Sequence, residues 1–87
     1  MMPRISFFFG ISIYMFYNDH SPPHFHAMYN EYGALIALET GEVLDGRLPP
    51  RALRLVREWL GDHSDELRAN WESARRKEAL TPVPPLE

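Results

Sequence analysis

Hydrophobic residues change their spacing halfway along the chain, and this change limits the folds that it can adopt. From Ile5 to Tyr17, apolar residues recur at every second position, which is the period of a β-strand with one apolar face. From Leu53 to Ala74 they recur at steps of three and four residues, as on one side of a helix. A sheet and a helix with these patterns can cover each other's apolar sides. The chain is therefore predicted to be an α+β domain.

Turn-forming residues divide the first half into short strands. Gly10 marks either a bulge in one strand or the tip of a hairpin, and we favour a short strand, a bend and a longer second strand. The alternation assigns Phe7 and Phe9 to the apolar face. The later strands are expected at 24–29, 34–39 and 42–44, after turns at 18–19, 30–33 and 40–41. These segments predict an antiparallel sheet of four or five strands.

The second half begins with Pro49-Pro50, and proline suits the first turn of a helix because its missing N–H is not needed there. We expect one long C-terminal helix, from Arg51 to Lys77, packed on one face of the sheet with its tryptophans in the core. Gly61 followed by Asp62 offers an alternative. Two helices meeting there would allow a helix-turn-helix that binds DNA.

The 87 residues suffice for one domain, assigned to residues 1–80, with a proline-rich tail at 81–87 that forms a strap or a frayed end. A domain this small would gain stability from a partner protein, a homodimer interface or a metal. The chain has no cysteine, which favours the cytoplasm and excludes thiolate metal ligands. A net charge of -3 argues against broad capture of nucleic acid. The apolar run at 5–17 is too short to span a membrane.

Three of the four histidines lie between Asp19 and His26, around the pair Pro22-Pro23. His24 and His26 would project to the same face of a strand, and His20 could fold back to join them. Three imidazoles suit a divalent transition metal such as zinc. His20, His24 and His26 are therefore candidate metal ligands.

A metal-free reading gives His24 and His26 the roles of general base and general acid, a pair that suits cleavage of RNA. The alternative is that the three histidines have a structural role only. In that reading the histidines form hydrogen bonds with Asn18, Asp19 or a backbone carbonyl. No nucleophile motif or glycine-rich phosphate loop accompanies them, so the sequence leaves open whether the protein is an enzyme.

Three arginines cluster around the predicted start of the helix: Arg47, Arg51 and Arg54. They are candidates for binding phosphate or an acidic partner. The alternative is a solvated helix face, since Arg54 precedes Glu58 by four residues, a spacing that favours pairing.

The chain resembles the small bacterial family 4160 of domains of unknown function. The resemblance covers nearly the whole length. Its motifs are Pro3-Arg4-Ile5-Ser6, Gly10-Ile11, Tyr17-Asn18-Asp19-His20, Pro22-Pro23-His24-Phe25-His26, Glu39-Thr40-Gly41-Glu42, Arg51-Ala52-Leu53, Trp59 and Trp71. The chain departs from the family pattern at Gly61, where a helix-favouring residue is usual.

The resemblance implies no settled activity. It implies a neighbouring gene for a short protein of family 2442, an arrangement similar to a toxin–antitoxin pair. We therefore favour a binding or regulatory module of a two-protein pair, with the histidine segment at the contact surface. The alternative is an RNase-like or metal-dependent hydrolase that uses His20, His24 and His26.

Overall fold

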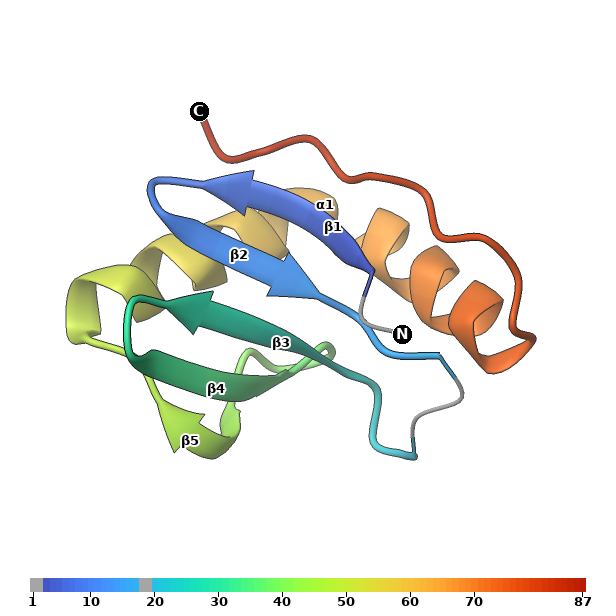
Figure 1. The fold of residues 1–87 in the computed structure, drawn as a ribbon, viewed down its shortest axis with the longest axis horizontal. Coiled ribbons are helices and arrows are strands. Elements are labelled where there is room, and N and C mark those ends of the chain that lie inside the picture. The colour runs from blue at the N-terminus through green and yellow to red at the C-terminus, as the bar shows by residue number, and fades with distance from the viewer. Residues whose placement is uncertain (1–2, 18–19) are drawn as a thin grey trace.

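A computed structural model describes residues 3–17 and 20–87 of the chain (Figure 1). Five strands form one sheet in the order β1-β2-β3-β4-β5, and each strand is antiparallel to its neighbours. One long helix follows, which confirms the α+β prediction. The elements are β1 (Arg4–Phe8), β2 (Ile11–Tyr14), β3 (His24–Tyr29), β4 (Tyr32–Ala37), β5 (Val43–Arg47) and α1 (Pro50–Arg75). The predicted turn at residues 18–19 lies outside the described residues.

Gly10 lies at the tip of a hairpin, where Phe9 and Gly10 connect β1 to β2. Both residues have positive φ angles, 49° and 80°, as a two-residue turn between twisted antiparallel strands requires. The hairpin alternative is therefore confirmed. The second strand is shorter than the first, with four residues against five, so the expected longer strand was wrong.

A β-bulge in β1 overturns the predicted exposure of its aromatic residues. The register shifts between Arg4 and Ser6, so that Phe7 pairs with Ser12 and Phe8 with Ile11. Phe8 is buried as a result, whereas Phe7 is 51% exposed. Phe9 belongs to the turn and is 57% exposed. The extra residue of the bulge reverses the alternation, and a simple two-residue period misses this.

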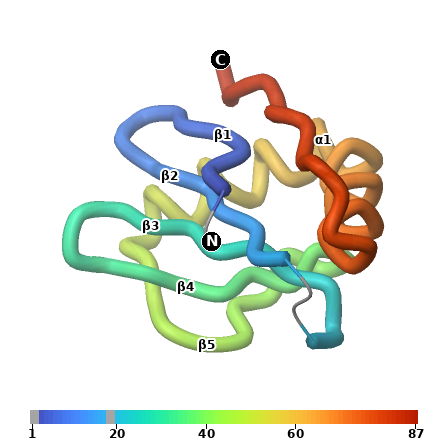
Figure 2. Tube along the Cα trace, turned by 45° about the vertical axis from the view of Figure 1, so that its right-hand side comes forward, coloured from blue at the N-terminus to red at the C-terminus, as the bar shows by residue number. Residues whose placement is uncertain are grey.

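Helix α1 lies against one face of the sheet (Figures 1 and 2), and the buried apolar residues of the two form the core. Trp59 is fully buried and contacts the rings of Phe8 and Phe25. Trp71 is also buried, so both tryptophans occupy the predicted core. Apolar residues from the central strands complete it: Ile11, Ile13, Ala27, Ala34 and Ile36.

The helix continues through Gly61 and is kinked two residues later, at His63, whose φ and ψ are -128° and 23°. One non-helical residue cannot supply the turn of three or four residues that a helix-turn-helix needs. The alternative of two separate helices was therefore wrong, and the DNA-binding reading loses its basis. Among the described residues, no helix has both the length and the apolar character to cross a membrane.

The C-terminal tail runs along the outer side of β1 and along α1 (Figures 1 and 2). The amide side chain of Asn70, which is buried, donates to the Thr81 carbonyl and accepts from the Thr81 N–H, both at 2.8 Å. The Val83 N–H donates to the Ile5 carbonyl, and the Trp59 indole donates to the Pro84 carbonyl. These contacts make the tail a strap that covers the edge of β1.

Candidate functional site

The segment that leads into β3, His20 to Pro23, is mostly exposed and is held at its far end by two hydrogen bonds. The Leu38 N–H donates to the Pro23 carbonyl at 2.9 Å, which extends the pairing of β3 with β4. The ring of His24 bonds the Pro22 carbonyl through Nδ1 at 2.8 Å. We call His20 to Pro23 the approach segment.

The bond to Pro22 determines where the proton of His24 resides. A carbonyl oxygen only accepts hydrogen bonds, so Nδ1 of His24 must carry the hydrogen. In the neutral ring the lone pair then lies on Nε2, the arrangement found where a backbone carbonyl orients a histidine for metal binding or proton transfer. The same bond is also the structural alternative that the sequence offered, a hydrogen bond to a backbone carbonyl.

His24 is the most buried of the three histidines, at 3% exposure, and it packs against α1. Its ring lies 5.3 Å from that of Trp71, centroid to centroid, and the two rings are tilted by 54°. Trp71 lies far along the chain from His24, in the second half of α1. No local pattern could have indicated this contact.

The structure brings the rings of His20 and His26 each close to that of His24. The centroid of the His24 ring lies 5.9 Å from that of His20 and 5.5 Å from that of His26. His26 is half-buried and packs on Phe16 at 4.1 Å, whereas His20 is exposed. The predicted contacts with Asn18 and Asp19 lie outside the described residues.

The predicted metal ligands do not form a defined metal site. Within residues 3–17 and 20–87, no group of three or more histidine, aspartate or glutamate side chains is arranged to hold a metal ion. The ligand set His20, His24 and His26 therefore stays a prediction.

A pocket of about 220 Å³ lies beside the approach segment. Pro23 and Trp71 supply its apolar wall, and the ring of Trp71 also packs against His24. The charged residues of the pocket come from the β4–β5 connection and from α1: Glu39, Arg68 and Glu72. Sequence reasoning missed this pocket because its walls come from three separate parts of the chain.

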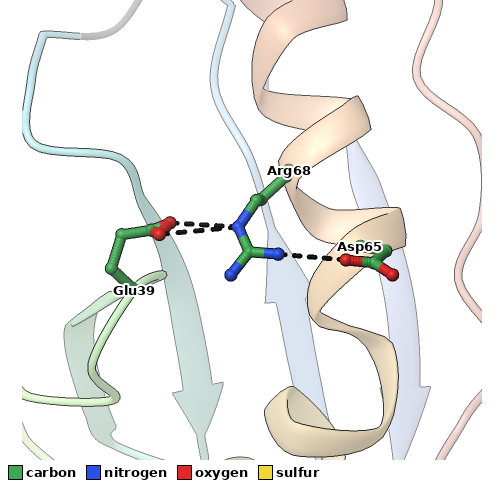
Figure 3. Close-up of polar contacts among 3 residues, drawn as sticks. All are labelled: Glu39, Asp65 and Arg68. Atoms are coloured by element: carbon green, nitrogen blue, oxygen red, sulfur yellow. Dashed lines mark hydrogen bonds and ion pairs between the residues drawn. The ribbon is translucent and has the colours of Figure 1, made fainter.

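Arg68 joins two of these parts (Figure 3). Its Nε donates to both carboxylate oxygens of Glu39, at 3.1 and 3.4 Å, and its Nη1 donates to Asp65 at 3.0 Å. The hydrogen bond and the charge of Glu39 raise the pKa of Arg68 above its usual value. The guanidinium therefore stays charged and holds the rim of the pocket together.

The arginines predicted to bind phosphate or a partner are all exposed. Arg51 lines a separate pocket of about 220 Å³ at the start of α1, together with Phe9 and Tyr29. The guanidinium of Arg47 lies 5.1 Å from the centre of the Tyr32 ring. Neither Arg47 nor Arg54 lines the pocket that contains Arg51, so their predicted joint role stays a prediction.

His63 does not join the other three histidines. Its Nδ1 contacts the Glu66 carboxylate, and its ring lies 6.0 Å from that of Trp59. It also lines a shallow hollow beside the C-terminal tail, formed in part by Pro84 and Pro85.

The molecule is thus a small α+β domain in which a five-stranded meander carries a histidine segment next to a helix-lined pocket. The chain belongs to the family described as a domain of unknown function, DUF4160, whose family model matches residues 10–72. This confirms the resemblance. The match spans β2 to β5 and most of α1, and so includes the approach segment. Comparison with curated proteins and with solved structures found no significant match.

Proposed function

We propose that the protein is a binding module that docks one partner protein on the approach segment and the adjacent pocket. The observation that carries the proposal is the position of an exposed segment, His20 to Pro22, directly beside a pocket with an apolar wall. Segments that are exposed and held by the surrounding structure are frequent sites of recognition.

The bracing of the approach segment favours binding. The bonds at Pro22 and Pro23 hold the backbone before β3, so a partner need not order it on contact. Less conformational entropy is then lost in the complex. The two prolines limit the backbone further because their φ angles are restricted.

The pocket indicates the chemistry of the docking group. Pro23 and Trp71 suit an apolar side chain. Two exposed carboxylates stand beside them, Glu39 paired with Arg68 and Glu72 with Arg75 at 3.7 Å. We expect an apolar residue of the partner to enter the pocket with a basic residue beside it. The family 2442 protein that the resemblance implies is the partner to test, and the pair would act as a toxin–antitoxin-like system.

The experiment measures the affinity for that family 2442 protein by calorimetry. Glu72→Arg reverses a charge at the rim of the pocket and should weaken binding by about tenfold, or about 1.4 kcal/mol. Glu31→Arg makes the same change in the β3–β4 turn, at the opposite end of β3, and should leave the affinity unchanged. No binding by the unaltered protein, or equal weakening by both variants, would reject the proposal.

A hydrolase is the second candidate, since the rings of His20 and His26 lie 5.9 and 5.5 Å from that of His24, whose Nδ1 bonds the Pro22 carbonyl. In this reading His24 and His26 exchange protons with an RNA substrate, or the three histidines hold a divalent metal such as zinc. His26→Gln should then abolish RNA cleavage while the thermal unfolding temperature stays close to that of the unaltered protein. Cleavage that survives this substitution, with no metal bound after addition of zinc, would remove this candidate.

A further inference from the structure

The face of the sheet opposite α1 has no helix against it among the described residues, and Phe16 packs on its central residue, His26. In Figure 1 the helix passes behind the sheet, and no helix among the described residues covers the face toward the viewer. Phe7 and Met28 belong to this face because both pair with Ser12, and they are 51% and 42% exposed. We call this surface the open face.

One row of directly opposed residues crosses the open face over all five strands. Arg4 pairs with Tyr14, Tyr14 with His26, His26 with Leu35, and Leu35 with Asp45. Directly paired residues project to the same side of a sheet. The row therefore runs from a cation on β1, through three ring or apolar side chains, to an anion on β5.

This order of charges is self-complementary. A two-fold axis in the plane of the open face, parallel to β3 and passing by His26, exchanges the two ends of the row. The axis places Arg4 of each copy opposite Asp45 of the other copy, which gives two such pairs. It also brings the Met28 side chains of the two copies next to each other at the centre. Both charged residues are exposed, so they are accessible to a second copy.

We infer that the open face binds a second copy of this chain, giving a two-fold symmetric dimer of two stacked sheets. The aligned stacking of two twisted sheets about 10 Å apart is a common packing. The Arg4 guanidinium already lies 5.0 Å from the centre of the Phe7 ring, which holds it at the edge where the Asp45 carboxylate of the mate would arrive.

The area of the open face limits how tightly two copies can bind each other. Five strands about 4.8 Å apart, each about five residues of 3.3 Å, make a patch of roughly 400 Å² in projection. Stable interfaces bury about 800 Å² per partner. The side chains add surface to the projected area, but the interface is still small. We expect a weak dimer, with a Kd of roughly micromolar order.

Sedimentation equilibrium between about 1 and 500 µM tests the dimer, a range chosen around that Kd. The mass should rise from 10.1 kDa toward twice that value. Arg4→Glu and Asp45→Arg should each weaken the dimer by about tenfold or more, because each places like charges together at both ends of the row. Arg54→Glu, an exposed charge reversal on α1, is the matched control and should leave the mass curve unchanged.

Mixing the two charge variants separates a docking effect from a folding defect. In a mixed dimer the glutamate introduced in one chain would face the arginine introduced in the other, and the unaltered Asp45 and Arg4 would face each other as well. An equimolar mixture should therefore regain the dimer that each variant lacks alone. The inference would be overturned if the unaltered protein stayed monomeric at all concentrations, or if Arg4→Glu dimerised as strongly as the unaltered protein. It would also be overturned if the equimolar mixture formed no dimer. None of these results bears on the docking of a partner at the approach segment.

Discussion

Replacing Asn70 by alanine should detach the C-terminal strap and destabilise the domain. The side chain makes two hydrogen bonds to the backbone of Thr81, each worth about 1 kcal/mol net. If the strap stays in place without them, a backbone N–H and a carbonyl lose their partner in a part-buried site. If it detaches, both groups reach water, but the burial of Val83, at 4% exposure, is lost, which costs about 1.5 to 2 kcal/mol.

The first route costs about 2 kcal/mol or more. The second costs the burial of Val83 and also the hydrogen bonds of the tail to Ile5 and Trp59, so we expect a loss of about 2 to 3 kcal/mol for Asn70→Ala. A domain of this length is stable by roughly 4 to 13 kcal/mol, so the loss is a large share of the total. Urea unfolding followed by tryptophan fluorescence measures it, since Trp59 and Trp71 are both buried in the fold. The urea concentration at the midpoint of unfolding should be clearly lower for Asn70→Ala than for the unaltered protein.

Thr81→Ala is the matched control, because only the backbone of Thr81 takes part in the two bonds and its side chain is exposed. It should change the free energy of unfolding by less than about 0.5 kcal/mol, as surface substitutions usually do. A loss below about 0.5 kcal/mol for Asn70→Ala, or an equal loss for both variants, would refute the role given to this side chain.

Four further predictions concern the backbone and the ion-pair network. Gly46→Ala should cost more than about 2 kcal/mol, because its new Cβ would lie 2.1 Å from the Gly33 carbonyl oxygen. Gly61→Ala should instead stabilise by about 0.5 to 1 kcal/mol, since no atom lies within 4 Å and alanine favours the helix; urea titrations of the two variants should shift in opposite directions. Phe9→Asn should stabilise the β1–β2 turn by roughly 0.5 to 1 kcal/mol, because asparagine tolerates a φ of 49° better, and a lower thermal midpoint would contradict this. The raised pKa of Arg68 means that its contribution is complete below the usual arginine pKa and is lost only as pH rises through the higher folded value. The difference in stability between the unaltered protein and Arg68→Ala should thus be the same at pH 7 and pH 9, and a difference that shrinks by pH 9 would argue against the assigned cause.

The fold could be predicted in outline because its strongest signals are local. Prolines before His24 and the turn at Asn30 bound β3, whose predicted range of 24–29 matches the structure. The strands after it were predicted at 34–39 and 42–44 and lie at Tyr32–Ala37 and Val43–Arg47, so their ends differ by one to three residues. Turn composition indicates that a strand ends, but pairing with neighbours decides where.

The candidate site could be predicted only in part. Strand periodicity places His24 and His26 on one side of β3, and their rings are indeed neighbours. That His24 is buried against Trp71, and that Glu39 meets Arg68 across 29 positions, depends on how α1 crosses the sheet. Contacts between distant parts of the chain leave no periodic trace in the sequence.

The strap along β1 also has a consequence for how the protein behaves at high concentration. A sheet has two edge strands, and an edge with free N–H and carbonyl groups can recruit strands from other molecules into aggregates. The Val83 N–H donates to one such group on β1, the Ile5 carbonyl. At the opposite edge, the positive φ of Gly46 and the register shift between β4 and β5 make strand β5 irregular. Loss of the strap would therefore expose the edge of β1. A detached tail should therefore promote fibril formation at high protein concentration.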